Sequence, residues 1–330
     1  MQIVYKLVEK ADVFVTNLKS ETKQKMGIDY EALSRLNPAL IHANMTGFGP
    51  KGPLAHIGGY DPLGQAVSGM MHLVDSKEPY YLQSVILDQM GSILLSHSVL
   101  AALLARERQG FGQEVTVSLY SAALMLMQVN IGASSLMGKN CVDPWSRLDQ
   151  PPLRTCYRCG DGKWIQGTNH PEQRYWPSFC RITGLQHLEN DPRFAGSMDR
   201  IKNANELIPI IDEVMGQKSR DEWARLFMEA GLMFVAIQTL DEVVKDPQLW
   251  ANDYMVDFEH PFFGTIQIPG YPTTFSASGA GTDRPAPGLG EHTDEILSEI
   301  GFSDSTIAQL KNSKAVMQKQ PAQAKRYQSG

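Results

Sequence analysis

The chain has 330 residues and a formal net charge of −6, from 30 basic and 36 acidic side chains, and 42% of its residues are hydrophobic while 20% are charged. At roughly 150 residues per domain this length predicts about two domains, and the composition is that of a folded α/β protein, not of a disordered or collagen-like one. The acidic balance offers no basic field for a phosphate backbone or an anionic membrane, so we expect neither nucleic acid nor a membrane surface as a partner.

The first part of the chain alternates helical and strand patterns. Apolar residues at helical spacing and runs of β-branched residues distinguish the two, and Asp29 marks a helix start that Asn37-Pro38 terminates. A strand–helix–strand succession at this spacing predicts a parallel sheet. The expected elements are a helix over 2–10, a strand over 11–17, a helix over 30–36 and a strand over 40–45.

A loop rich in glycine and proline follows over 47–61. Because it is flexible and polar, we expect it at the surface or in a site. Beyond it, the pattern predicts a long Leu- and Ala-rich helix that the Gly110-Phe111-Gly112 break terminates. The expected elements are helices over 62–71 and 88–108, a strand over 114–119 and a Met-rich helix over 122–127.

Pro144, Pro151 and Pro152 mark a linker, after which we expect a second domain with a hairpin turned at Gly160-Asp161-Gly162. The patterns predict an α/β protein with a Rossmann-like parallel sheet in a large domain over 1–130, a linker over 131–150, a smaller α/β domain over 151–220, and a linker and C-terminal return to the large domain over 221–330. The expected elements are a hairpin over 157–166, helices over 173–183, 204–215, 221–230, 240–244 and 294–300, strands over 234–238 and 264–269, and an extended segment over 279–290.

The four cysteines are too few for a disulfide-stapled scaffold. The sequence from Met1 lacks the charged and apolar regions of a secretory leader, so we expect a cytoplasmic protein. The best candidate for a membrane span, 93–104, is interrupted by Ser96, His97 and Ser98 and falls short of the ~20 residues that a bilayer needs. We therefore expect no transmembrane segment.

Common catalytic motifs are missing from the sequence. Cys156 and Cys159 form a C-x-x-C pair, but Cys141 and Cys180 lack the paired spacing of a four-ligand zinc site, so we expect no metal and interpret the pair as flanking a hairpin strand. The sequence contains no phosphate-binding glycine motif, no G-x-S-x-G elbow and no histidine pair at i, i+4. These absences argue against P-loop, serine-hydrolase and zinc-protease chemistry.

Two carboxylates remain as candidate reactive groups. Asp61 ends the glycine-rich loop, and Asp88 stands where the long helix is expected to begin. On local sequence alone, Asp88 is interpreted as an N-cap that accepts backbone N–H bonds, and Asp61, which precedes Pro62, is interpreted as a cap as well. Neither position indicates catalysis by itself.

Distinctive sequence blocks follow one another along nearly the whole chain. They are Ala11-Asp12-Val13 with Asn17, Met26-Gly27-Ile28-Asp29-Tyr30-Glu31, Leu36-Asn37-Pro38, Thr46-Gly47-Phe48-Gly49-Pro50, Gly59-Tyr60-Asp61-Pro62, Ala101-Ala102-Leu103-Leu104 with Arg106-Glu107-Arg108, Asp191-Pro192-Arg193-Phe194, Asp246-Pro247-Gln248 and Leu289-Gly290-Glu291-His292-Thr293. In their content and order these blocks resemble the family III CoA-transferases, the CaiB/BaiF group that includes formyl-CoA and crotonobetainyl-CoA:carnitine transferases. So many blocks in the family's order make the resemblance specific.

In that family the nucleophile is an Asp at the start of the helix that carries the Arg-Glu-Arg block, and the resemblance assigns this role to Asp88. Backbone donors and the macrodipole of a helix N-terminus would hold its carboxylate as the anion. The implied activity moves coenzyme A from an acyl-CoA donor to a carboxylic acid through a mixed anhydride and an aspartyl-CoA thioester. It implies no permanently bound cofactor, because coenzyme A enters as the acyl-CoA substrate.

The resemblance also implies residues that bind coenzyme A. Asn17, Leu18 and Lys25 stand where the family contacts it, Thr46 opens the glycine-rich block, and Tyr60 stands at a position that faces the active site. Lys25 replaces an Arg that relatives often have, which keeps the charge without the planar fork. For Tyr60 the alternative interpretation is loop packing. Backbone N–H donors for tetrahedral oxyanions are expected from Gly47, Gly49, Gly58 and Gly59.

Two alternatives accompany the transferase hypothesis. The α-methylacyl-CoA racemases share the implied fold, but they carry a basic His where this chain has Tyr60, and a phenol with a pKa near 10 is a poor base at neutral pH. Relatives also begin about eighty residues earlier, and a parallel sheet without its opening strands leaves a sheet edge uncovered. We therefore expect either a truncated gene product or a second chain, and the second case predicts a non-catalytic or half-site subunit.

The resemblance further implies a homodimer whose two chains pass through each other like linked rings. The linkers around 143–152 and 279–290 are open enough for that arrangement. Partners are then the acyl-CoA and carboxylic acid substrates and a second copy of the chain. The sequence does not indicate which acids are exchanged.

Overall fold

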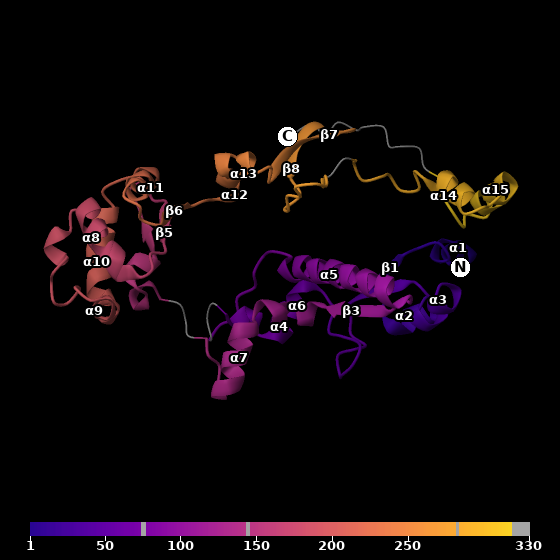
Figure 1. The fold of residues 1–330 in the computed structure, drawn as a ribbon, viewed down its shortest axis with the longest axis horizontal. Coiled ribbons are helices and arrows are strands. Elements are labelled where there is room, and N and C mark those ends of the chain that lie inside the picture. Colours follow the sequence, from indigo (N-terminus) through magenta and orange to yellow (C-terminus); the bar gives the residue numbers. More distant parts are fainter. Residues whose placement is uncertain (74–76, 143–145, 282–283, 319–330) are drawn as a thin grey trace. The chain divides into compact units, whose positions relative to one another are not determined.

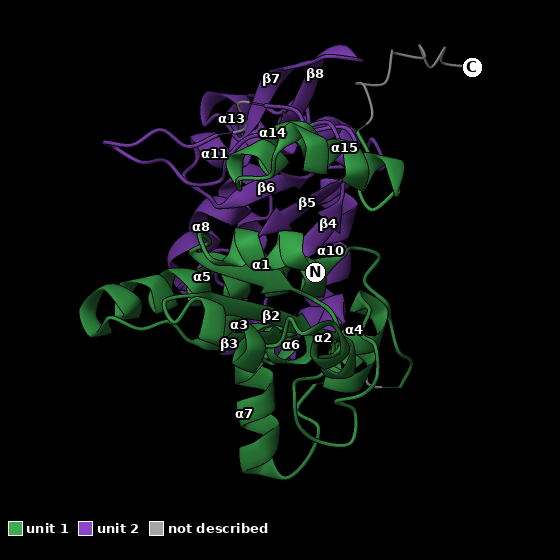
Figure 2. Cartoon of the chain, turned by 90° about the vertical axis from the view of Figure 1, so that its right-hand side faces the viewer, with its two compact units in different colours: residues 1–145, 292–318 green, residues 146–291, 319–330 purple. Residues whose placement is uncertain are grey.

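The computed structural model describes residues 1–73, 77–142, 146–281 and 284–318. The described residues form two compact units, coloured separately in Figure 2. Unit 1 combines residues from 1–145 with 292–318, and unit 2 lies within 146–291. Each unit has a hydrophobic core of its own.

Unit 1 is built on a three-stranded parallel sheet of order β1-β2-β3. Val13 pairs with Ile41, and Ala43 pairs with Val115, so the central strand presents residues that are buried on both faces, as parallel sheets do. The sheet confirms the expected α/β class. Its strands are β1 (Val13–Thr16), β2 (Ile41–Thr46) and β3 (Glu114–Ser118).

Helices of unit 1 surround this sheet (Figure 1). The helix over Tyr30–Leu36 has the predicted bounds, and the Asp29 side chain accepts from the backbone N–H of Ala32 as expected of a local cap. The helices are α1 (Gln2–Val8), α2 (Ser20–Met26), α3 (Tyr30–Leu36), α4 (Asp61–Ser68), α5 (Ile86–Gln109), α6 (Leu119–Leu126), α7 (Gln128–Met137), α14 (Thr293–Glu299) and α15 (Asp304–Asn312), with a 3-10 turn at Met70–His72.

The long helix α5 packs along β2 and β3 and against α6. Its 24 residues run unbroken through Ser96, His97 and Ser98, which corrects the expectation that no apolar segment is long enough to cross a bilayer. The pair α6 and α7 meets the same criterion only when joined across a 77° bend. Length and composition are weak evidence for a membrane span, since helices that cover a sheet share both.

The C-terminal helices α14 and α15 lie beside α1 within unit 1 (Figure 1). The Lys6 ammonium donates to the Ile300 carbonyl over 3.3 Å and stands 5.0 Å above the Phe302 ring. Ile3 packs against the small cluster formed by Leu297, Ile300 and Ile307.

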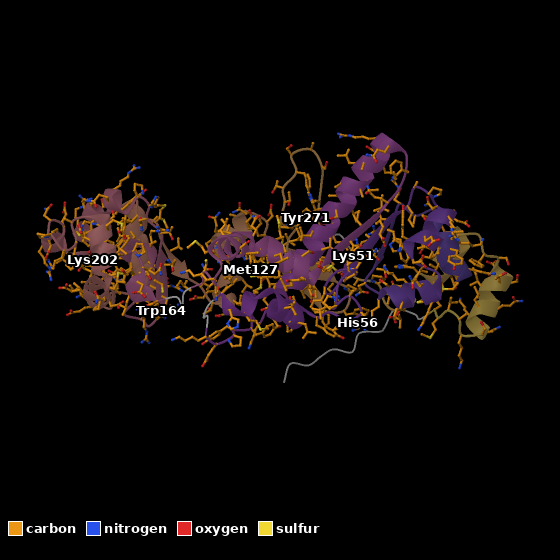
Figure 3. The ribbon with its side chains drawn as sticks, turned by 90° about the horizontal axis from the view of Figure 1, so that it is seen from below. Lys51, His56, Met127, Trp164, Lys202 and Tyr271 are labelled. Carbon is orange, nitrogen blue, oxygen red and sulfur yellow. The ribbon has the colours of Figure 1, made fainter. Side chains whose placement is uncertain are left out.

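Unit 2 contains the antiparallel sheet β4-β5-β6 and a stacked aromatic core. The rings of Phe227 and Phe234 lie 4.4 Å apart, and Phe179 stacks on both. The hairpin predicted over 157–166 is confirmed, with Trp164, labelled in Figure 3, on its second strand. The first strands and helices of the unit are β4 (Cys156–Arg158), β5 (Trp164–Gly167), α8 (Glu172–Thr183), α9 (Ser197–Lys202), α10 (Ala204–Met215), α11 (Arg220–Glu229) and β6 (Phe234–Ile237), with 3-10 turns at Arg147–Asp149, Pro152–Arg154 and Gln186–Leu188.

The remainder of unit 2 ends in a two-stranded antiparallel hairpin that pairs Met255 with Pro269. Its second strand has the predicted bounds 264–269, whereas its first strand was not predicted. Its elements are α12 (Leu240–Val243), α13 (Pro247–Ala251), β7 (Met255–His260) and β8 (Gly264–Pro269).

A buried ion pair links two helices of unit 2. Arg200 is fully buried, and its Nε donates to Glu172 Oε2 over 3.1 Å. Its Nη1 donates to the carbonyls of Phe194 and Ala195, and its Nη2 donates to the side chains of Gln173 and Ser197. Glu172 Oε1 accepts from the Leu153 amide. Because both charges are hydrogen-bonded on all sides, the pair is tolerated inside the core.

Candidate active site

In unit 1, the carboxyl ends of two strands, the glycine-rich loop and the first turns of α5 enclose a cavity of about 550 Å³. Sites of open parallel sheets lie at this edge, where strands end and helices begin. Asp88 is the only carboxylate among the described residues of the lining. The lining consists of Val15, Thr16, Asn17, Met45, Gly59, Tyr60, Asp88, Ser92 and Leu95.

Asp88 lies in the first turn of α5, which begins at Ile86 and not at Asp88. The Asp88 side chain is exposed, and among the described residues we find no hydrogen bond to its carboxylate. Partial burial, and then the nearby charge of Asp61, raise the pKa of Asp88 above its usual value. These findings correct the interpretation of Asp88 as an N-cap and the expectation that backbone donors hold it as the anion.

The backbone donors at the start of α5 go to Asp61 instead. Asp61 is 3% exposed, and its Oδ2 accepts from the amide of Leu87 over 2.6 Å and from that of Asp88 over 3.2 Å. Val85, at the N-cap position, makes no side-chain cap bond. Asp61 therefore caps α5, which is distant in sequence, and not its own helix α4, whose N-cap position is Tyr60 and which has no side-chain cap bond. It thereby positions the first turn that carries Asp88.

Gln65 orients the Asp61 carboxylate from one turn further along α4. Its Nε2 donates to Asp61 Oδ1 over 2.6 Å, while its amide also bonds both backbone groups of Leu82. Gln65 is fully buried. The segment before α5, the cap and α4 thus form one connected hydrogen-bond network.

Two glycines bring the loop over 47–59 back onto its own start. A Cβ on Gly59 would lie 2.2 Å from the Cα of Gly47, and a Cβ on Gly47 would lie 2.6 Å from the Cα of Gly59. Only glycine permits this approach. The contact delivers Gly59 and Tyr60 to the cavity, while Lys51 and His56, labelled in Figure 3, lie further along the loop.

A third glycine sets the distance between α5 and the sheet. A Cβ on Gly91 would lie 2.0 Å from Met45 Cε, so the Met45 side chain occupies the space that a larger residue would need. Met45 is the next-to-last residue of β2 and lines the cavity. The first turns of α5 therefore approach the end of β2 closely, which places Asp88 over that strand end.

A smaller cavity of about 50 Å³ adjoins the first, and the two share Asn17, Met45 and Gly59. Of the residues predicted from the sequence, the larger cavity gathers Asp88, Asn17, Gly59 and Tyr60. The smaller one is lined by Leu18, Thr46, Gly47, Gly49 and Gly58 in addition to the shared residues.

Lys25 is exposed on α2 and lines neither cavity, so the structure does not bring this predicted residue to the site. Lys19, which the sequence analysis missed, lines the smaller cavity and reaches across Gly58, where a Cβ would lie 3.5 Å from Lys19 Cε. Its position directly after Asn17-Leu18, which the resemblance had placed at the site, was the signal in the sequence that could have identified it.

A buried polar network holds the segment that follows Asn17 and Leu18. Lys23, on α2, donates to the Asn44 side chain on β2, and Asn44 Nδ2 donates to Glu114 Oε1 over 2.7 Å. Burial lowers the pKa of Lys23, while Glu114 acts in the opposite direction. The network fixes α2 against the sheet beside the cavities.

Within the described residues, no cluster of three or more His, Cys, Asp or Glu side chains is arranged to hold a metal ion. Cys156 begins β4 and Cys159 directly follows its last residue, so the pair flanks the first strand of the first hairpin of unit 2, as predicted. Burial raises the pKa of Cys159 to about 11 and that of Cys180 to about 12, so both thiols stay protonated at neutral pH.

The chain is similar in sequence and fold to known proteins. The sequence profile of CoA-transferase family III matches residues 1–293. The (R)-2-hydroxy-4-methylpentanoate CoA-transferase of Clostridioides difficile is 32% identical over 320 residues, which cover 96% of this chain and 79% of the relative. The succinyl-CoA:glutarate CoA-transferase of Homo sapiens is 27% identical over 314 residues, covering 94% and 71%. A CaiB/BaiF family protein from Brucella suis superposes with a TM-score of 0.80 at 27% identity, covering 91% of this chain and 78% of that structure.

Proposed function

We propose that this chain, which belongs to CoA-transferase family III, moves coenzyme A from an acyl-CoA donor to a carboxylic acid through a covalent intermediate at Asp88. The observation that carries the proposal is the position of Asp88: its carboxylate has no hydrogen-bond partner among the described residues, and it lines the cavity at the strand ends. A nucleophile must keep its lone pairs available, and here Asp61 takes the helix donors that would otherwise engage them.

The proposed sequence of steps balances without ATP. The Asp88 carboxylate attacks the thioester carbonyl of the donor, the C–S bond breaks, and CoA thiolate leaves a mixed anhydride. The thiolate then attacks the Asp88 carbonyl of that anhydride, which expels the donor acid and forms an aspartyl-CoA thioester. The acceptor carboxylate repeats the steps in reverse, so one thioester and one carboxylate enter and one of each leaves.

The raised pKa of Asp88 suits this role. A carboxylate destabilised by partial burial and by the charge of Asp61 is more basic than a free aspartate, and basicity increases nucleophilicity. Formation of the neutral anhydride or thioester removes the charge and with it the repulsion from Asp61. The first covalent step is therefore favoured by the same contacts that hold α5 in place.

We propose that backbone N–H groups of the glycine-rich loop stabilise the oxyanions. Gly59 lines the cavity with Asp88, and Gly47, Gly49 and Gly58 line the cavity beside it. Fixed donors that face a developing negative charge contribute strongly to such reactions. Coenzyme A is proposed to reach Asp88 past Asn17, Leu18, Thr46 and Tyr60.

We also propose that the active form is a homodimer. In the single chain, Leu100 of α5 is 67% exposed and Leu136 of α7 is 89% exposed, and further apolar residues on both helices are uncovered. Apolar surface of this kind is normally buried by a partner. Size-exclusion chromatography with light scattering should give twice the chain mass, and a monomer would contradict this part of the proposal.

The test of the mechanism is covalent trapping. The purified chain is incubated with an acyl-CoA and hydroxylamine, digested and analysed by mass spectrometry, and we expect a hydroxamate on the peptide that contains Asp88. Asp88→Ala should lose both the adduct and CoA transfer while its circular dichroism spectrum is unchanged. Asp12→Ala, a control at an exposed carboxylate of the same unit, should keep the adduct at Asp88. Absence of an adduct in the wild-type chain would favour the half-site subunit hypothesis.

A further inference from the structure

The larger cavity contains little charge besides Asp88. Its other described lining residues are apolar or neutral, and none of them is a Lys, Arg or His. Asp61, which lies beneath the start of α5, adds a second negative charge nearby. An anionic group that entered this space away from the loop donors would lose its water without gaining a counter-ion.

The lining also has a direction. Asp88, Ser92 and Leu95 stand at i, i+4 and i+7 of α5, so they share one face of the helix and extend about 10 Å along its axis. An acid whose carboxyl group reacts at Asp88 projects its tail along this face. At roughly 1.3 Å per C–C bond, a tail of about four to six carbon atoms advances about 5–8 Å, and a contact distance of about 4 Å then brings its end against the side chain at position 95.

The far end of this path is apolar. Leu95 is half-buried on α5 and ends the path, while Met45, which packs against Gly91, and Val15 of β1 are the other large apolar residues of the lining. Between the two ends stands Ser92, whose hydroxyl already donates to the Asp88 carbonyl over 2.8 Å. Ser92 therefore offers a ligand one neutral acceptor and no charge.

We infer, on the basis of the proposed function, that the acids exchanged at Asp88 are monocarboxylic acids with an uncharged, mainly apolar tail, and that Leu95 is a specificity-determining residue for that tail. A dicarboxylic acid of equal length places its second carboxylate at the apolar end of the path. A monocarboxylic acid of the same length places a methyl group there instead, and its burial is favourable because it removes apolar surface from water.

Lys19 is a cation that could bind the second carboxylate of a dicarboxylic acid. Its position in the smaller cavity argues against that role. It lines the smaller cavity, beyond Asn17 and Gly59, whose volume of about 50 Å³ has room for a water molecule or two but not for an acid tail. A carboxylate bound at Lys19 would leave the apolar face of α5 unused.

The test compares acids that differ only at the tail end. With acetyl-CoA as donor and the full chain as enzyme, new thioesters are measured for pentanoate against glutarate and for hexanoate against adipate. We expect kcat/KM for each monocarboxylate to exceed that of its dicarboxylate by at least about 100-fold. Leu95→Lys should raise kcat/KM for glutarate about 10-fold or more and lower it for pentanoate. Gln109→Lys, at an exposed polar position of the same helix outside the lining, should leave the ratio unchanged.

A second variant at position 95 that keeps an apolar side chain tests the inference even if Leu95→Lys fails to fold. Leu95→Ala should lower kcat/KM for hexanoate by about 10-fold relative to propanoate, whose tail is too short to reach position 95. Glutarate equal to or better than pentanoate in the wild-type chain would overturn the inference, and loss of that glutarate activity in Lys19→Met would place the tail at Lys19. In both results CoA transfer persists. Failure of every acid, together with absence of a hydroxylamine adduct at Asp88, would instead remove the proposed function and this inference with it.

Discussion

Removal of the Asp61 carboxylate should destabilise the helix that carries the proposed nucleophile. In Asp61→Ala, the amides of Leu87 and Asp88 lose their acceptor, and the Gln65 amide loses one of its partners. At about 1.5 kcal/mol for each backbone donor and about 1 kcal/mol for the side-chain amide, the gross loss is about 4 kcal/mol. Water that enters the vacated site and relief of the repulsion with Asp88 offset part of this loss. We therefore expect Asp61→Ala to lower the free energy of unfolding by about 3 kcal/mol.

Hydrogen exchange measured by mass spectrometry localises the effect. The chain has two units, and its described tryptophans at 164, 176, 223 and 250 all lie in unit 2, so tryptophan fluorescence would follow the wrong unit. Peptides that cover 86–95 should exchange about 100-fold faster in Asp61→Ala, in line with the expected free-energy loss. Urea unfolding followed by circular dichroism gives the total change in stability.

Asp29→Ala provides the matched control, because Asp29 caps α3 with a single bond to the Ala32 amide. A single local cap costs about 1 kcal/mol. Equal losses for Asp61→Ala and Asp29→Ala, with unchanged exchange over 86–95, would refute the assignment of Asp61 as the cap of α5. Asp61→Asn separates the effect of charge from that of hydrogen bonding, because the amide retains one acceptor oxygen. Removal of the charge should lower the pKa of Asp88 and shift the pH profile of adduct formation to lower pH.

Three further predictions concern other parts of the chain. Asp88→Asn should be more stable than the wild type at pH 7, by less than about 1 kcal/mol because the group is exposed. Since the pKa of Asp88 is raised in the folded chain, this difference in the free energy of unfolding should close as the pH falls below about 3.9. A constant difference in urea unfolding across pH 3 to 7 would contradict the prediction. Gly59→Ala should lower the free energy of unfolding by about 1–3 kcal/mol and remove most CoA transfer, because its Cβ meets the Gly47 backbone. Gly132→Ala in α7, which has open space around it, should unfold at the same urea concentration as the wild type or higher. Equal behaviour of the two variants would be evidence against the loop contact. Arg200→Met leaves Glu172 buried without a counter-charge and should cost about 3–5 kcal/mol, while Arg200→Met with Glu172→Gln should recover part of that loss in thermal unfolding; no recovery would show that the charge is not the cause.

Local signals in the sequence were sufficient for elements whose ends are set by their own residues. Helix α3 has the predicted bounds because Asp29 caps it from the adjacent position and Pro38 prevents its continuation. The strands β1 to β3 were found through their apolar runs, and their parallel pairing follows from the helices between them. The short helix α2 was missed, because its sequence from Ser20 to Met26 is mostly polar.

Interactions between distant residues could not be predicted in this way. The role of Asp61 depends on two amides 26 and 27 positions later, and no local pattern reveals such a partner. For the same reason, Asp88 was interpreted as a cap when the true cap was elsewhere. The choice of Lys25 followed the resemblance to the family, whereas the structure turns that residue outward and brings Lys19 to the smaller cavity.

The backbone contact between Gly47 and Gly59 has an evolutionary consequence. It brings the two ends of the intervening loop together, so the residues between the two glycines form a closed loop whose ends are fixed beside the end of β2. We expect homologous chains to tolerate a longer, shorter or different loop there without displacing Asp88, the proposed nucleophile. Diversification of this kind needs only that the two glycines persist together.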